Sequence, residues 1–345
     1  PGSVPSSFDG ADATRVSLQR ITYTQRGLVA RSEVAIDPTE DDAGQAFLST
    51  NQWYDEVGRT VGVWAPNSPG RKTTFDGLGR ATAEYLTDRG GDVSPGAGSH
   101  ADVWSDSTRA SVLSDDKVLD QTEYRYITAN GPRKGLLDLV RHRERIHDTS
   151  ATGALGSSTA VTSFRGLFYD IASRVTHSVD YGTNDTTNHQ FVSGTSDPTI
   201  TQGSPPANGP NALVTQTIYD PFRGLATTTV RPGGRIDRTI VDALGRTIAT
   251  VENEVGDPVT LAWNSGSQSW TVSNASEEND EDRVTTFVHN GIGQLVKMTA
   301  IANEETTGGV DQVTEYIHGV SSDPEGPDPF VSSSIFSNDL LLKII

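Results

Sequence analysis

A six-residue motif recurs along the chain, and this recurrence constrains the fold more than any other feature of the sequence. The motif is an aromatic or β-branched residue followed by Asp, two further residues and Gly-Arg. Copies in one register begin at Tyr54, Phe75, Val241 and His289, the last with Asn and Gln in place of Asp and Arg. Because stacked repeats bury apolar surface against their neighbours and share no central core, the repeat decides how the 345 residues are organised.

Three further segments carry imperfect copies. Segment 169–174 has Ser in place of the Gly, segment 219–224 has one extra residue before its Gly, and segment 23–28 is a weaker match. Copies starting at 54 and 75 are 21 residues apart, and those at 219 and 241 are 22 apart. We assign the following motif residues to a structural site: Tyr54, Asp55, Gly58, Arg59, Phe75, Asp76, Gly79, Arg80, Tyr169, Asp170, Arg174, Tyr219, Asp220, Gly224, Asp242, Gly245, Arg246, His289, Asn290 and Gly293.

The chemistry of the motif predicts a tight turn. Asp or Asn with Gly three residues later favours a type I turn, in which the side chain accepts from local amides and Gly takes the left-handed conformation. Such a turn with an adjacent bulge joins two antiparallel strands. The flanking segments, such as 73–75 before a turn and 247–251 after one, are rich in β-branched residues. Each repeat is therefore predicted to be one β-hairpin of about 21 residues.

A lone hairpin is marginal in water, so the hairpins are expected to pair edge to edge. We predict an all-β chain of consecutive antiparallel hairpins forming a spiralling sheet, a partial β-shell. Such strands alternate between interior and solvent, which agrees with an apolar content of only 34%. The best helix signal is 136–147, but its alternating arginines suit a strand as well, and the sequence leaves the two possibilities open.

Three stretches lack the motif, at about 86–166, 182–215 and 252–283, and the first two contain Pro/Gly loop signals. We interpret them as lengthened hairpin loops within one array and not as domain boundaries. The acidic run 277–282 is interpreted as a solvated loop. The expected division is a lead-in with a degenerate repeat at 1–50, the hairpin array at 51–320, and a truncated loop with the start of the next repeat at 321–345.

The recurring Tyr-Asp-x-x-Gly-Arg frame, as in Tyr54 to Arg59, resembles the YD repeat of the RHS family, and the resemblance covers about residues 50–320. That family includes bacterial RHS-repeat proteins, the cocoon subunits of insecticidal toxin complexes and animal teneurins. The resemblance implies a β-sheet that spirals into a hollow shell, which encloses a toxic C-terminal domain or acts as an adhesion surface. It also implies a secreted or cell-surface location. The stretch 323–326 matches the Asp-Pro-x-Gly letters of the plug in bacterial members, but the segment that should precede it is absent, so we interpret it as a Pro/Gly loop.

Composition excludes several classes of function. The formal net charge of −18 repels polyanions, so no nucleic acid partner is expected. The absence of Cys rules out a disulfide framework, a Cys zinc site and a thiol nucleophile. The longest apolar cluster, 340–345, is far too short to span a membrane, so no membrane insertion by this segment is expected. The ends carry no signal peptide or terminal motif, and we read the chain as an internal fragment.

The sequence also lacks the usual signatures of catalysis. The seven His residues include no His-x-x-x-His pair, and the ligand pattern around Asp180 is wrong for a calcium loop, so no metal is expected. Neither a Gly-x-Ser-x-Gly elbow nor a phosphate-binding loop occurs. We therefore expect no enzyme activity, no catalytic residues and no cofactor.

Two residue classes admit a binding interpretation beside a structural one. The pairs Asp76 with Arg80 and Asp242 with Arg246 could form a ladder that meets sugar hydroxyls, but their recurrence favours turn chemistry and the pinning of one hairpin to the next. Exposed Trp residues could stack on glycans. Trp53 and Trp64 flank a turn and are expected to pack in the sheet, whereas Trp104 and Trp263 lie in motif-free stretches.

The leading hypothesis is a non-enzymatic structural segment of a large RHS-repeat protein, part of a β-shell scaffold that encloses a toxin cargo or presents a surface. Its expected partner is the remainder of the same shell, with a C-terminal cargo domain or a cell-surface glycan or protein as further candidates. The alternative is a glycan- or protein-binding adhesion module that acts through the long loops.

Overall fold

The computed structural model describes residues 17–37, 46–90, 113–147, 150–183, 197–276, 281–302, 310–318 and 341–345. Within these ranges the chain forms strands and no helix. Trp104, the 323–326 stretch and residues 277–280 of the acidic run lie outside them. Accordingly, no helix in the described part of the chain has the length and apolar character needed to cross a membrane.

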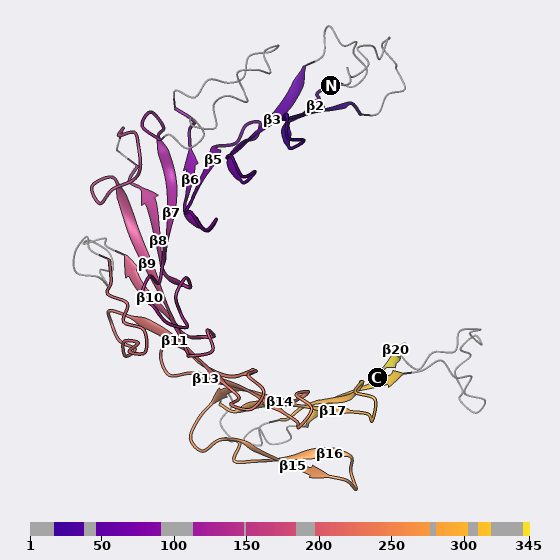
Figure 1. Ribbon diagram of the computed structural model, residues 1–345. Coiled ribbons are helices and arrows are strands. Elements are labelled where there is room, and N and C mark those ends of the chain that lie inside the picture. Colours follow the sequence, from indigo (N-terminus) through magenta and orange to yellow (C-terminus); the bar gives the residue numbers. More distant parts are fainter. Residues whose placement is uncertain are drawn as a thin grey trace. The chain divides into compact units, whose positions relative to one another are not determined.

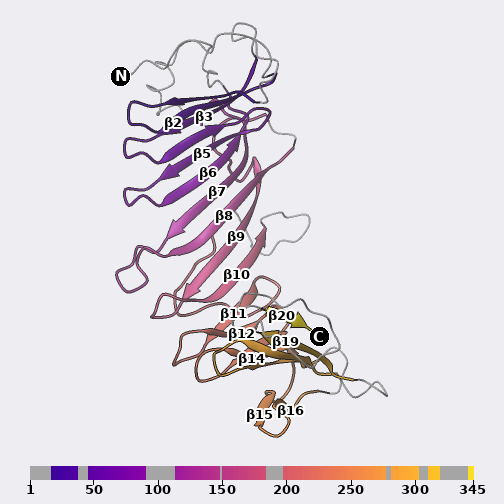
Figure 2. The same ribbon diagram turned by 90° about the vertical axis from the view of Figure 1, so that its right-hand side faces the viewer.

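The chain divides into two compact units, and the division falls within strands β9 and β10. The first unit comprises residues 1–167 and 180–201, and the second comprises 168–179 and 202–345. The strands of the first unit are β1 Gln19–Tyr23, β2 Val29–Ala35, β3 Phe47–Tyr54, β4 Thr60–Trp64, β5 Gly70–Phe75, β6 Ala81–Thr87, β7 Val118–Tyr126, β8 Leu137–Arg145 and most of β9 Ala160–Tyr169. Each pairs antiparallel with the next along the chain (Figure 2).

The second unit continues the same pattern. Strand β10 Val175–Thr183 crosses the division, and the further strands are β11 Leu213–Tyr219, β12 Ala226–Val230, β13 Ile236–Val241, β14 Thr247–Glu254, β15 Thr260–Asn264, β16 Ser269–Ser273, β17 Arg283–His289, β18 Leu295–Ala300, β19 Gln312–His318 and β20 Leu341–Ile344. Strands β11 to β14 and β17 to β20 pair antiparallel in chain order. Strands β15 and β16 form a separate two-stranded sheet (Figure 1).

The prediction of an all-β chain built from consecutive antiparallel hairpins is confirmed. The undecided segment 136–147 contains strand β8, because residues 137–145 pair with β7 on one side and with β9 on the other. The motif-free stretch 86–166 holds more than a lengthened loop, since strands β7 and β8 form a further hairpin inside it. The stretch 252–283 likewise holds the β15–β16 hairpin.

Antiparallel order sorts the connections within each unit. The motif turns join β3 to β4 and β5 to β6 in the first unit, and β11 to β12, β13 to β14 and β17 to β18 in the second. Successive connections of an antiparallel sheet lie at alternate ends of the strands. The motif turns of a unit therefore lie along one row of strand ends, here called the motif edge, as Figure 2 shows for the first unit. The turns from β1 to β2 and from β7 to β8 lie at this edge too. The connections that alternate with these turns differ in length and lie at the other edge.

The core is divided into small clusters along the sheets. In the first unit, Trp53, Val61 and Trp64 are buried together, with Phe75 packed against them, and the two indole rings lie 4.2 Å apart between centroids. A second cluster gathers Val118, Leu155 and Ala160. In the second unit, Val251, Val259 and Val284 form a cluster of their own. This distribution fits a repeat protein, in which each repeat contacts its neighbouring repeats and no single core forms.

The side chains of Lys72 and Asp116 form a buried ion pair in the first unit. Lys72 on β5 and Asp116, just before β7, are both almost fully buried, and Lys72 Nζ lies 2.7 Å from Asp116 Oδ2. The pair therefore fastens the end of the long β6–β7 connection to the sheet. Removing one partner of such a pair leaves an uncompensated charge in the interior.

We expect Lys72→Met to lower the free energy of unfolding by about 3 kcal/mol, because Asp116 keeps its buried charge. The double variant Lys72→Met/Asp116→Leu should recover most of that loss, since it leaves no isolated charge. Urea unfolding of the three proteins measures both values. A Lys72→Met variant as stable as the double variant would contradict this role of the pair.

Candidate functional site

The motif turns are the most regular side-chain arrangement in the structure. In the copy at 75–80, Asp76 Oδ1 accepts hydrogen bonds from the amides of Leu78 at 2.9 Å and Arg80 at 3.0 Å. Asp76 Oδ2 accepts from Arg80 Nε at 2.8 Å, and the Gly79 amide donates to the Asp76 carbonyl at 3.0 Å. Gly79 has φ +85°, the left-handed conformation that Gly adopts without steric cost. The turn is thus closed by one carboxylate and one glycine.

The same contacts recur in the other copies. Asp55, Asp170 and Asp242 each accept from the amides two and four residues later at 2.8 to 3.0 Å and pair with Arg59, Arg174 and Arg246. Asn290 accepts from Ile292 and Gln294, and its Nδ2 donates to Gln294 Oε1 at 2.8 Å. The glycines at the fourth turn position, Gly58, Gly245 and Gly293, have φ of +94°, +81° and +91°.

Two copies close the turn differently. At 169–174 Ser173 replaces Gly and still has φ +64°, a conformation that costs a residue with a Cβ atom about 1 kcal/mol. At 219–224 the extra residue places Arg223 before Gly224, and Asp220 Oδ1 accepts from the amides of Phe222 and Arg223. Gly224 has φ +70°, and its amide donates to the Asp220 carbonyl at 2.9 Å.

The motif Arg also reaches the next copy. The guanidinium of Arg59 lies 4.6 Å from the centre of the Phe75 ring, and its Nη1 donates to the Asp76 carbonyl at 3.3 Å. In the second unit, Arg174 lies 4.4 Å from the Tyr219 ring centre, and Arg246 Nη1 donates to the Asn290 carbonyl at 3.4 Å. One arginine therefore closes its own turn and contacts the following one.

The aromatic residue of the motif contacts the preceding copy in turn. The hydroxyls of Tyr54 and Tyr219 donate to the carbonyls of Val29 and Val175, both at 2.8 Å. Each of these carbonyls belongs to the residue just after the motif of the preceding copy. Tyr169 is buried, and its amide donates to Gln202 Oε1 at 3.1 Å.

This contact pattern reveals a copy that the sequence analysis missed. The Tyr126 hydroxyl donates to the Ala81 carbonyl at 2.8 Å, the residue just after the motif at 75–80. Arg80 lies 4.1 Å from the Tyr126 ring centre, and its Nη1 donates to the Gly135 carbonyl at 2.9 Å. Because Ile127 stands in place of Asp and the turn is longer, the motif letters are lost while the contacts remain.

His318 marks a second missed copy. One nitrogen of its ring, Nε2, lies 2.7 Å from the Leu295 carbonyl, the residue just after the motif at 289–294. It therefore occupies the place that Tyr54 and Tyr219 occupy in their copies. The sequence signal was Tyr316-Ile317-His318-Gly319, in which the aromatic residue precedes Gly directly and no Asp intervenes.

The turn glycines face a second restriction besides their left-handed backbone. A Cβ atom at Gly79, Gly135 or Gly224 would lie 3.1 to 3.3 Å from Nη1 of the preceding copy's Arg59, Arg80 or Arg174. Where no Arg follows the turn glycine of the preceding copy, a leucine stands in that place: Leu28 lies over Gly58 and Leu225 over Gly245. A side chain of each such copy thus covers the glycine of the next.

The turn contacts also set the charge state of the motif carboxylates. For Asp76 the largest influence is the hydrogen bond from the Arg80 amide, and the pKa lies below its usual value. For Asp55, Asp170 and Asp242 burial is the largest influence and raises the pKa, but the hydrogen bonds and charge of the motif Arg outweigh it and lower the pKa. Burial and the nearby Arg246 lower the pKa of His289.

A related cluster lies in the turn between β12 and β13. Asp237 accepts from Arg231 Nε at 2.6 Å, from Arg235 Nε at 3.0 Å and from the Asn253 amide at 3.2 Å. Burial, the largest single influence, raises the pKa of Asp237, but the two guanidiniums and the amide together lower it to about 2. This carboxylate therefore stays charged far into the acid range.

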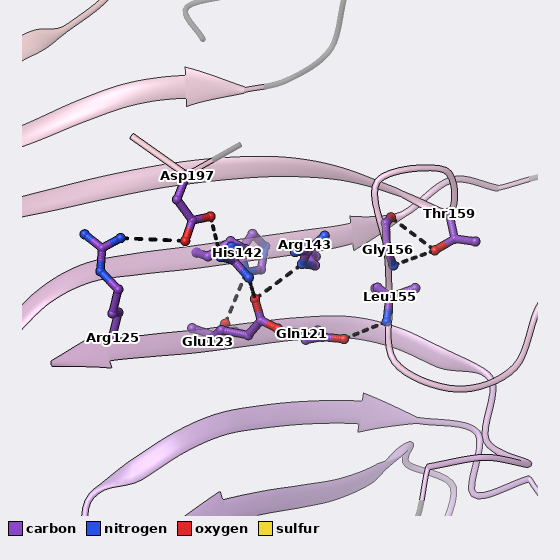
Figure 3. A network of polar contacts seen from close by, with 11 residues as sticks. Gln121, Glu123, Arg125, His142, Arg143, Leu155, Gly156, Thr159 and Asp197 are labelled. Carbon is purple, nitrogen blue, oxygen red and sulfur yellow. Dashed lines mark hydrogen bonds and ion pairs between the residues drawn. The ribbon is translucent and has the colours of Figure 1, made fainter. Parts of the chain in front are cut away.

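A second polar site lies on the β7–β8 hairpin of the first unit (Figure 3). Arg141 pairs with Glu123 and with Asp197, and Arg125 Nη1 lies 3.7 Å from Asp197 Oδ2. Arg143 Nε lies 3.4 Å from Glu123 Oε2. Asp197 follows β10 along the chain, so these contacts attach the β10–β11 connection to the face of β7 and β8. Arg125 Nε also lies 3.1 Å from Asp138 Oδ1, so three guanidiniums face three carboxylates in this network.

The polar groups of both sites hold parts of the chain together: the motif residues close turns, and the β7–β8 network holds a connection to the sheet. Both oxygens of each motif aspartate are occupied by groups of its own turn, so the arrangement favours the structural interpretation of the Asp–Arg pairs over a sugar-binding ladder. No group of three or more His, Asp or Glu residues that could hold a metal ion occurs among the described residues.

Arg80 and Tyr126 are expected to stabilise the first unit together. A double-mutant cycle with Arg80→Ala and Tyr126→Leu, measured by urea unfolding, should give a coupling energy of about 0.5 to 1 kcal/mol. As a control, Arg80→Ala combined with Tyr23→Leu should be additive, because Tyr23 belongs to a copy that does not adjoin Arg80. Additivity in the Arg80–Tyr126 cycle would contradict the assignment of Tyr126 as a repeat residue.

Stability should fall in acid between about pH 4 and pH 2. The five aspartates Asp55, Asp76, Asp170, Asp237 and Asp242 have folded-state pKa values below the ordinary 3.8, so they stabilise the fold above that pH. That stabilisation is lost as the pH falls through the folded-state values, since the unfolded chain then binds more protons. Urea unfolding at pH 6, 4, 3 and 2 measures the fall.

Asp237→Asn provides the matched control for this pH dependence. The variant should be less stable at pH 6, because it lacks the two ion pairs, and should lose less stability than the natural chain between pH 4 and pH 2. An identical slope in both proteins would show that Asp237 is not among the groups responsible.

Comparison with known proteins places the chain in no family by sequence. No protein-family model matches it, and no curated protein does. Solved structures that it resembles include TcdB2–TccC3 with Cdc42 (TM-score 0.28, 11% identity, 86% of this chain covered). They also include TcdB2–TccC3 without its hypervariable C-terminal region (0.28, 12%, 86%) and a Tc holotoxin pore of Photorhabdus luminescens (0.23, 12%, 88%). The chain spans 16% of the length of each of these structures.

Proposed function

We propose that the chain is a non-enzymatic structural segment of a larger RHS-type repeat protein and forms part of the wall of a β-shell. The observation that carries the proposal is the contact between consecutive copies, in which Arg59 lies over Phe75 and Arg80 over Tyr126. The copies at 54–59, 75–80 and 169–174 each offer an arginine to the ring of the following copy. Tyr54, Tyr126 and Tyr219 each contact the preceding copy through their hydroxyls. Such contacts extend a wall without requiring a central core.

The use of charged groups supports a role without catalysis. Catalytic carboxylates and bases need access to a substrate. The motif aspartates are instead saturated by the amides and the arginine of their own turns, and the buried Lys72–Asp116 pair holds a connection to the sheet. These charged residues thus hold turns and connections in place.

The further parts of the proposal rest on the resemblance of the motif to the YD repeat. The wall belongs to a secreted or cell-surface protein, its main partner is the remainder of the same shell, and the enclosed space holds a toxin cargo or the outer face presents a surface. The cargo itself lies beyond the repeats in this family.

The test uses the longest natural polypeptide that contains this chain. Electron cryo-microscopy should show its hairpins in a sheet that continues into neighbouring repeats and encloses part of the polypeptide. Arg59→Ala/Arg80→Ala should then speed protease cleavage of the enclosed part by about tenfold, because each substitution removes a contact between copies and opens the wall more often.

Arg71→Ala is the matched control, because Arg71 lies on β5 near these residues, is exposed and takes no part in the contacts between copies described above. It should leave the cleavage rate unchanged. A reconstruction in which these residues form an isolated domain, or equal protease protection in both variants, would overturn the proposal.

The alternative function, adhesion through the long connections, is favoured by one described feature. Trp263 is 46% exposed on the β15–β16 hairpin, whereas Trp53 and Trp64 are buried. An exposed indole ring fits a binding role better than a packing role.

A further inference from the structure

The β15–β16 hairpin departs from the repeat pattern of the second unit. It lies in the connection between β14 and β17, and these two strands pair directly with each other. The hairpin therefore adds no strand to the repeat sheet and forms a small sheet of its own beside it (Figures 1 and 2). A wall built from the repeats does not need this insertion.

The hairpin is nevertheless firmly attached at its base. Asp282 is almost fully buried, and its carboxylate accepts from the Val255 amide at 2.8 Å and from the Ser276 amide at 2.7 Å. One side chain thus holds the segments that enter and leave the insertion. Glu254 adds a second tie, because its Oε1 accepts from the Val259 amide at 2.8 Å.

The inner face of the hairpin packs on the repeat sheet. Val272 contacts the cluster of Val251, Val259 and Val284, and Trp270 Nε1 donates to the Phe287 carbonyl at 2.9 Å. An isolated two-stranded hairpin is marginal in water, so these contacts explain how it holds a fixed shape.

Trp263 lies opposite Trp270 near the tip of this supported hairpin. The two indole rings meet edge to face, with centroids 5.0 Å apart and planes at 63°. Such a contact covers at most one face of the Trp263 ring, and 46% of the side chain is exposed. Trp263 therefore offers an apolar surface to solvent whose position is fixed by Trp270.

The composition around this ring is unusual for the chain. Residues 259–276 contain no charged side chain, although the chain has 27 Lys and Arg and 45 Asp and Glu residues. Ten of these 18 residues are Ser, Thr, Asn or Gln. At the tip, Asn264 Oδ1 accepts from the amides of Gly266 and Ser267, which shapes the turn, and the hydroxyls of Ser267 and Ser269 lie 2.7 Å apart.

We propose that the tip of the β15–β16 hairpin, with Trp263 as its platform, binds a neutral carbohydrate. The C–H groups of a pyranose ring carry partial positive charge and stack on the negative face of an indole ring. The surrounding hydroxyl and amide groups can exchange hydrogen bonds with sugar hydroxyls. The absence of charge disfavours a charged ligand, which would be desolvated without a partner of opposite charge. This site is independent of the shell role proposed above.

The experiment uses the full 345-residue chain. Lactose, maltotriose and tri-N-acetylchitotriose serve as soluble probes in saturation-transfer difference NMR, and a printed array of neutral and acidic glycans extends the search. We expect saturable binding of at least one neutral glycan. Trp263→Leu, which keeps an apolar side chain but removes the π face, should weaken that binding by at least tenfold, equivalent to about 1.4 kcal/mol.

Two controls separate binding from folding. Thr271→Val changes an exposed residue that pairs with Ala262 on the face of the hairpin opposite to Trp263. Its hydroxyl cannot reach a sugar stacked on Trp263, so the variant should leave affinity within about twofold. In Trp263→Leu the Trp270 indole N–H resonance should shift, because the neighbouring ring is removed, but the N–H should remain protected from exchange with solvent, since its hydrogen bond to Phe287 is retained.

Four results would overturn the proposal. The first is that no neutral glycan binds saturably at a probe concentration of about 5 mM, which is on the order of the weakest affinities of interest. The second is that Trp263→Leu leaves binding unchanged while the Trp270 N–H stays protected from exchange. The third is that only acidic glycans bind. Capture of a protein ligand through Trp263 without any sugar binding would equally reject a carbohydrate site in favour of protein docking.

Discussion

The contact between the arginine of one turn and the aromatic residue of the next is the interaction on which the rest of this structure depends. A carboxylate holds the arginine by its Nε and Nη2 atoms, as Asp76 holds Arg80, and Nη1 points onward to the next copy. Arginine suits this task because its planar fork can hydrogen bond a carboxylate and a carbonyl while stacking on a ring. The turn and the coupling between turns thus use the same side chain.

Because one arginine both closes a turn and couples it to the next, a chain with only 34% apolar residues can fold. Polar and cation–π contacts at the motif edge stabilise the pairing of neighbouring hairpins. The apolar residues therefore need only form small clusters, such as Trp53 with Trp64. The opposite edge carries no such constraint. Its connections range from the short turn after β12 to the long segment with the β15–β16 hairpin, because they are not needed to couple one repeat to the next.

The two edges therefore separate two tasks. The motif edge couples neighbouring copies, and changes there disturb two turns at once, since a Cβ atom at Gly79 would meet Arg59 of the preceding copy. The other edge accepts insertions, provided that they are attached at their base. Asp282 contributes to that attachment, because its buried carboxylate accepts from both segments that bound the inserted hairpin.

The sequence by itself determined the local chemistry: the Asp and Gly of each turn, the strands beside them and the all-β class, because these depend on residues within one hairpin. It did not reveal which arginine meets which ring, or that Tyr126 and His318 are repeat residues, since their turns have lost the motif letters. It also left 136–147 undecided. Only the tertiary structure decided these points, because strand pairing with β7 and β9, and contacts between residues as distant as Tyr126 and Ala81, depend on register across the sheet and not on spacing along the chain.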